Sequence, residues 1–73
     1  MTRLGETEIE MVERHIRGGE GHVARQREIV ASLPPDSDLA ETARQLLTLL
    51  EESLKNHREH LVRLLHSGSE AGV

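Results

Sequence analysis

Apolar residues recur along the first half of the chain with spacings that alternate between three and four. They stand at Ile9, Val12, Ile16, Val23, Val30 and Leu33, and Gly19 and Gln26 fill the two gaps in the series. This heptad repeat is typical of an α-helix that packs one stripe against a neighbouring helix. Thr7 followed three residues later by Glu10 matches a capping box, so the pattern predicts a first helix over about 7–33.

Two consecutive prolines, Pro34 and Pro35, end this pattern. Proline has no amide hydrogen to donate and restricts the backbone of the residue before it. We therefore predict a turn over 34–37, after which a second helix is expected over about 38–66. A connection this short makes the two helices antiparallel neighbours.

The second helix is expected to start near Ser37 or Asp38, and Asp38 with Glu41 matches another capping box. Gly68 suits the position just after a helix end, and 67–73 is expected to form a disordered tail. The apolar positions of this helix are Leu39, Ala43, Leu46, Leu47, Leu50, Leu54, Leu61, Leu64 and Leu65.

Charge placement supports both helices, because acids stand four residues before bases, the favourable order for i,i+4 pairs. These pairs are Glu10–Arg14, Glu13–Arg17, Glu51–Lys55 and Glu59–Arg63. The expected fold class is all-α: an antiparallel helical hairpin forming a single domain over 1–73. The apolar surface of the second helix is broader than one seam between two helices requires. We therefore expect a homodimer in which two hairpins form a four-helix bundle.

The expected interface between the two copies combines residues from both helices. On the first helix, a stripe beside the heptad series contains Met11, His15, Gly18, His22, Arg25 and Ile29. On the second helix, the surplus apolar positions are Leu47, Leu54, Leu61 and Leu65. All of these except Arg25 are assigned to the interface. An unidentified protein partner is a further possibility.

Composition narrows the function classes. The chain has no cysteine and no Phe, Trp or Tyr, and its net charge is −4 with neutral histidines. Disulfides, thiolate zinc sites and aromatic stacking platforms for nucleic acid are therefore excluded. The acidic balance disfavours nucleic acid and anionic lipid, although Arg14, Arg17, Arg25 and Arg27 are the residues to test for nucleic-acid binding. With no long apolar run and no signal-peptide pattern, we expect a cytoplasmic protein.

Three glycines fall within four positions, at Gly18, Gly19 and Gly21. No Lys-Ser/Thr follows them, so they do not match a phosphate-binding loop. The heptad register continues through them, which argues against a break in the helix. Gly19 lies in the seam, where we expect the second helix to approach closely, whereas Gly21 lies away from both stripes and has no predicted packing role.

His57 and His60 carry the main candidate metal chemistry, since an i,i+3 spacing can place both on one face. If residues i and about 70 − i face each other, Glu13 meets His57 and Glu10 meets His60. The four side chains could then hold zinc or another divalent ion. The alternative is a polar layer of Glu–His pairs that fixes helix register, and on balance we expect no metal and no cofactor.

The remaining chemistry is sparse. His15 and His22 lie two turns apart, about 10.5 Å along the axis, so they cannot share one ion within a chain. Charging all five histidines would take the net charge from −4 to +1, mostly around pH 6 to 7, so pH-dependent association is a hypothesis. Ser53 lies one turn before His57, but no oxyanion hole is implied. We therefore expect that the chain is not an enzyme.

Two segments resemble a group of small uncharacterised bacterial two-helix proteins. Residues 15–26 match H-I-x-x-G-E-x-H-V-x-R-Q, and residues 50–60 match L-E-x-S-L-x-x-H-x-x-H. The resemblance covers most of 9–65, and this chain departs from it in its extra glycines and its Pro-Pro turn. It implies the hairpin and no catalytic activity. The function expected is a self-associating protein–protein interaction or regulatory module, and the alternative is a histidine-based metal-binding or pH-sensing module.

Overall fold

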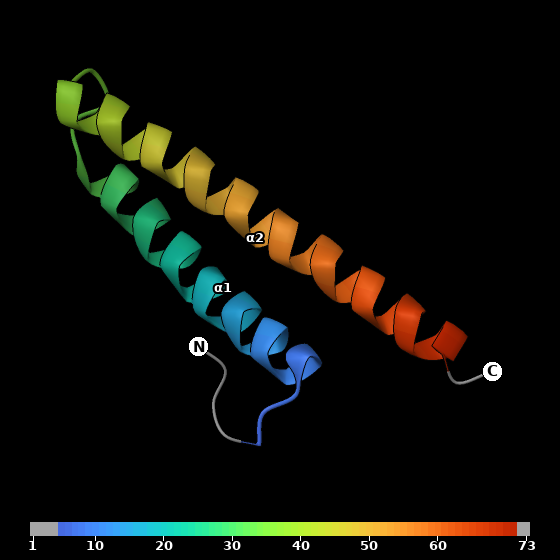
Figure 1. The fold of residues 1–73 in the computed structure, drawn as a ribbon. Coiled ribbons are helices and arrows are strands. Elements are labelled where there is room, and N and C mark those ends of the chain that lie inside the picture. Colours follow the sequence, from blue (N-terminus) through green and yellow to red (C-terminus); the bar gives the residue numbers. More distant parts are fainter. Residues whose placement is uncertain (1–4, 72–73) are drawn as a thin grey trace.

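The computed structural model describes residues 5–71, with the side chains of 68–71 excepted. Helix α1 spans Glu8–Ser32 and helix α2 spans Asp38–Ala71. They lie side by side in opposite directions and are joined by a short turn, as Figure 1 shows. The prediction of an all-α antiparallel hairpin is confirmed. No helix within the described residues is long and apolar enough to cross a membrane.

The predicted capping box at the start of α1 is confirmed. The Glu10 amide donates to the Thr7 hydroxyl oxygen at 3.1 Å, and the Thr7 amide donates to Glu10 Oε1 at 3.1 Å. At the other end, Leu33 is extended, with φ −95° and ψ 149°. This conformation is the one that a following proline imposes, so Pro34 ends the helix as expected.

A feature that sequence reasoning did not predict lies just before α1. Gly5 has φ 81°, in the left-handed region that favours glycine, and it precedes Glu6. The Glu6 carboxylate accepts two hydrogen bonds from Arg14, at 3.1 Å from Nε and 3.2 Å from Nη2. These bonds raise the pKa of Arg14 above its usual range. The predicted pairing of Glu10 with Arg14 is replaced by this contact, because the Glu10 carboxylate serves the capping box.

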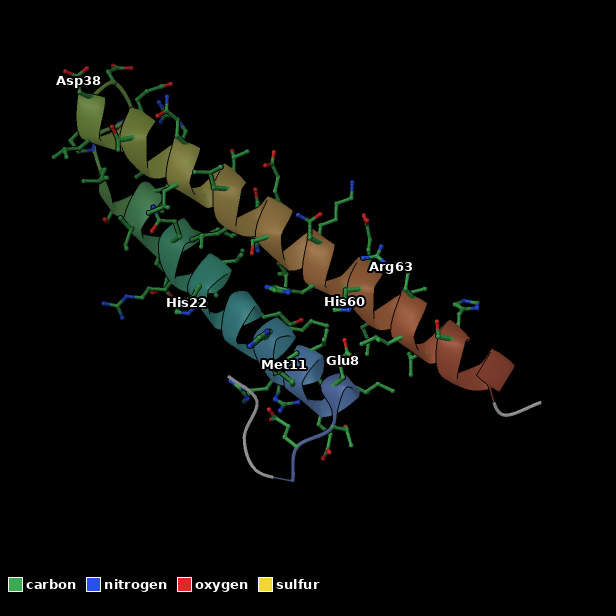
Figure 2. All side chains as sticks on the ribbon, in the orientation of Figure 1. Glu8, Met11, His22, Asp38, His60 and Arg63 are labelled. Atoms are coloured by element: carbon green, nitrogen blue, oxygen red, sulfur yellow. The ribbon has the colours of Figure 1, made fainter. Side chains whose placement is uncertain are left out.

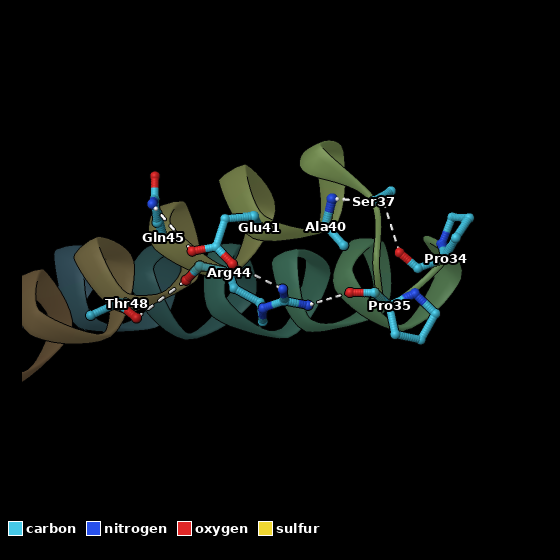
Figure 3. Close-up of polar contacts among 8 residues, drawn as sticks. All are labelled: Pro34, Pro35, Ser37, Ala40, Glu41, Arg44, Gln45 and Thr48. Atoms are coloured by element: carbon cyan, nitrogen blue, oxygen red, sulfur yellow. Dashed lines mark hydrogen bonds and ion pairs between the residues drawn. The ribbon is translucent and has the colours of Figure 1, made fainter.

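The predicted capping box of the second helix is wrong, because Ser37 rather than Asp38 is the cap. The Ser37 hydroxyl accepts from the Ala40 amide at 3.1 Å and donates to the Pro34 carbonyl at 2.7 Å, as Figure 3 shows. The third helical position is therefore occupied by an alanine, which has no side chain to complete a reciprocal pair. One serine thus starts α2 and also closes the turn.

Glu41 has a different role from the predicted one. Its carboxylate pairs with Arg44 at 3.1 Å and accepts from Gln45 at 3.5 Å (Figure 3). Arg44 also donates to the Pro35 carbonyl at 3.3 Å. The side chain of Arg44 thus bonds the start of α2 to the loop that precedes it.

Helix α2 continues to Ala71, five residues beyond the predicted end at 66. Gly68 does not end it, because a glycine inside a helix costs only about 1 kcal/mol relative to alanine. No proline follows Pro35 to force an end. The last two residues of the predicted disordered tail, 72–73, lie outside the described residues.

The seam between the helices follows a heptad repeat on both sides. Every predicted α1 position from Ile9 to Leu33 is buried or partly buried, with Val12 only 1% exposed. On α2, the heptad series of buried and partly buried residues is Ala40, Ala43, Leu47, Leu50, Leu54, His57, Leu61 and Leu64. Leu39 and Leu46, predicted as part of the apolar face, lie outside this series and are 69% and 47% exposed.

Two residues in the middle of the seam allow a close fit. A Cβ atom placed on Gly19 would lie 3.1 Å from Leu54 Cδ1, so the predicted close approach at Gly19 is confirmed. Gln26 is 6% exposed, and its Nε2 donates to the Ala43 carbonyl at 2.9 Å. The buried amide of Gln26 therefore has a partner across the seam, and this bond favours one register of the two helices.

Candidate functional site

The two sides of the seam differ in chemistry. On one side, here called the ion-paired side, Arg27 Nη2 lies 3.0 Å from Glu51 Oε2 and Arg58 Nη2 lies 3.0 Å from Glu20 Oε2. Both pairs join α1 to α2. The predicted pairing of Glu51 with Lys55 is replaced by this cross-helix contact. Exposed pairs of this kind contribute roughly 0.2–1 kcal/mol each and keep this side solvated.

The other side of the seam, here called the histidine side, carries an open groove. Its lining residues are Arg14, His15, Gly18, Gly19, His22, Ser53 and His57. The rings of His15 on α1 and His57 on α2 have centroids 5.4 Å apart, with an angle of 53° between their planes. Two imidazoles from different helices therefore meet directly across the seam.

A fourth histidine lies further along the histidine side, near the open end of the hairpin. His60 Nε2 is 3.6 Å from Glu8 Oε1, and Figure 2 shows the two side chains pointing toward each other. Both side chains are substantially exposed. The contact becomes an ion pair only when the imidazole is protonated.

The predicted metal cluster of Glu10, Glu13, His57 and His60 is not brought together. At the centre of the seam, the residues that meet have numbers that add up to 72 or 73 rather than 70, as His15 with His57 and Gly19 with Leu54 do. This offset follows from the turn, since Leu33 is the last seam residue of α1 and Ala40 is the first of α2. His57 consequently meets His15. Among the described residues, no group of three or more His, Asp or Glu side chains could hold a metal ion.

The predicted interface residues fall into three groups. Leu47, Leu54 and Leu61 occupy every seventh position of the α2 seam, where Leu54 is buried against Gly19 and the other two are partly buried. Their assignment to an interface between copies stays a prediction. Leu65 is 51% exposed but lies seven residues after Arg58, on the ion-paired side. The α1 stripe lies on the histidine side, with Met11 partly buried and His15, Gly18, His22 and Ile29 exposed.

Sequence reasoning missed an apolar patch that continues the histidine side toward the turn. It is formed by four exposed side chains, Ile29, Leu39, Leu46 and Leu49, which are here called the apolar patch. Leu46 and Leu39 lie one and two heptads before Ser53, and Ile29 lies one heptad after His22. The patch could have been predicted by starting the heptad series of α2 at Ala40. That series places Leu39, Leu46 and Leu49 beside the seam rather than in it.

The comparisons with known proteins add no assignment. No family model, curated protein or solved structure matches this chain. The resemblance to bacterial two-helix proteins stays a prediction.

Proposed function

We propose that this chain is a small interaction module that pairs with a second copy of itself to form a four-helix bundle. The observation that carries this proposal is the apolar patch. Its four side chains are 39% to 69% exposed, and their heptad positions fall on the side of the hairpin opposite the Arg–Glu pairs. Burying such side chains stabilises association by about 25 cal/mol per Å² of apolar surface.

The shape of the hairpin also supports a second copy. Helices α1 and α2 contact each other along one seam, so a single hairpin leaves both sides of that seam uncovered.

The distribution of residues favours one arrangement of the two copies. The apolar patch lies at the turn end of the histidine side, and the histidines lie toward its open end. A twofold axis along the hairpin places patch against patch and groove against groove, whereas the antiparallel arrangement would place leucines against imidazoles. Gly18 also lies on this surface, and a Cβ atom placed on it would meet nothing within 4 Å, so a partner helix can approach closely there.

The decisive test compares matched glutamate substitutions on the two sides. Leu46→Glu puts a charge into the apolar patch, and Leu65→Glu does the same on the ion-paired side at similar exposure, 47% against 51%. We expect sedimentation equilibrium to show a dimer for the unmodified chain and for Leu65→Glu. Leu46→Glu should weaken the dimer by more than tenfold, because an unpaired charge would be buried. The opposite pattern would assign the interface to the other side.

A further inference from the structure

His15 and His57 form a juxtaposition that the interaction role does not require. His15 is exposed on α1 beside the seam, and His57 is a partly buried seam residue of α2. Their ring centroids are 5.4 Å apart, and the rings are tilted by 53°. The two helices are held in register by the Gln26 bond and the Gly19–Leu54 contact, so this distance is set by the fold.

The spacing matches two ligands of one metal ion. Zn–N bonds of about 2.0–2.1 Å at tetrahedral angles place two ring centroids roughly 5 Å apart. Neutral imidazole is a preferred ligand of zinc, copper and nickel. We propose that His15 and His57 together bind a divalent transition metal ion of this class, which would bridge α1 and α2.

The surroundings of the pair are compatible with a cation. Arg14 also lines this groove. Its Nε and Nη2 atoms donate to the Glu6 carboxylate, which compensates the positive charge of Arg14. In a single hairpin the groove is open, so water can fill the remaining coordination positions there. With two protein ligands, the affinity should be micromolar rather than the nanomolar affinity of closed structural sites.

This site needs only one hairpin, so it does not depend on the proposed dimer. It also differs from the cluster predicted from the sequence, because the partner of His57 is His15 rather than His60 and two carboxylates. The competing interpretation is simple packing, since tilted aromatic rings commonly pack about 4.5–7 Å apart. Metal titration separates the two interpretations.

The test is isothermal titration of Zn²⁺, Ni²⁺ and Mg²⁺ into the untagged, chelator-treated chain at pH 7.5. We expect one zinc or nickel ion per chain and no binding of Mg²⁺, which prefers oxygen ligands. His15→Ala and His57→Ala should each weaken zinc binding at least tenfold. The double variant should be no more than twofold weaker than either single variant, because one ligand without the other no longer chelates.

Three controls make the result decisive. His66→Ala removes an exposed imidazole outside the groove and should change the zinc affinity less than twofold. Replacing His57, a seam residue, can itself destabilise the hairpin, so the second measurement uses the exposed His15. Zinc should raise the Tm of the unmodified chain and should not raise that of His15→Ala. Leu46→Glu should keep the zinc affinity even when it is monomeric.

Several outcomes would overturn the proposal. One is the absence of zinc or nickel binding by the unmodified chain at millimolar ion, which would leave ring packing as the only role of the pair. Another is an unchanged affinity in His15→Ala, and a third is the loss of zinc binding in monomeric Leu46→Glu. That last result would contradict a site within one hairpin while leaving the proposed dimer intact.

Discussion

Among the glycines Gly5, Gly18, Gly19 and Gly21, only Gly19 lies so close to another side chain that an added Cβ atom would touch it. A methyl group on Gly19 would meet Leu54 Cδ1 at 3.1 Å, whereas one on Gly21 would meet nothing within 4 Å. Both positions are helical, so both would gain about 1 kcal/mol of helix propensity on replacement by alanine. Only the packing cost differs between them.

We therefore expect Gly21→Ala to raise the free energy of unfolding by about 0.5–1 kcal/mol. The free energy of unfolding of Gly19→Ala should be lower than that of Gly21→Ala by about 1 kcal/mol or more, because the added methyl group overpacks the seam. Urea denaturation of the two variants measures this difference. Equal stabilisation by both substitutions would contradict the close approach at Gly19.

Gln26 offers a second residue-scale prediction. Gln26→Ala removes the bond to the Ala43 carbonyl and leaves a gap in the seam, so it should lower the free energy of unfolding by about 1–3 kcal/mol. Gln26→Leu fills the volume without a buried polar group and should stay within about 1 kcal/mol of the original chain. Thermal unfolding of both variants tests this. A leucine variant as unstable as the alanine variant would show that the hydrogen bond matters more than the volume.

At the scale of elements, the helix starts depend on single side-chain oxygens. The Ser37 hydroxyl accepts from the Ala40 amide, and Asp38 stands one residue inside the helix. We expect Ser37→Ala to cost about 0.5–2 kcal/mol of stability, as the loss of a cap usually does. Asp38→Ala should cost less, about 0.3–1 kcal/mol, because Asp38 interacts only with the helix dipole. If chemical denaturation showed a larger loss of unfolding free energy for Asp38→Ala than for Ser37→Ala, Asp38 would be the cap instead.

The elements themselves can be predicted because their signals are local and redundant. The α1 series from Ile9 to Leu33 fixes the buried stripe, and the prolines fix the end of the helix. The register between the helices cannot be obtained this way. Whether Ser37 or Asp38 caps α2 depends on one residue, and the seam series of α2 begins at an alanine that periodicity alone does not single out. An offset of two residues at this point then makes His15 rather than Glu13 the partner of His57.

At the scale of the whole molecule, the two sides of the hairpin offer a second copy different surfaces. The ion-paired side carries the Arg27–Glu51 and Arg58–Glu20 pairs, whereas the histidine side carries the groove and the apolar patch.

The difference between the ion-paired side and the histidine side can be inferred from the sequence only in part. Spacing identifies the α1 stripe containing His15 and His22, because this stripe runs parallel to a clear seam. The matching surface of α2 is not identified in the same way, since nine apolar positions on one helix do not reveal which ones a partner covers. In the structure Leu47, Leu54 and Leu61 lie in the heptad series of the seam, whereas Leu46 and Leu49 lie outside it and are exposed.

The most direct test of self-association is native mass spectrometry of the untagged, unmodified chain near pH 7. We predict a species of twice 8.2 kDa whose share grows with protein concentration. Addition of a chelator should leave this species in place, because the proposed interface is apolar rather than metal-bridged. A single species of 8.2 kDa at every concentration would contradict the four-helix bundle.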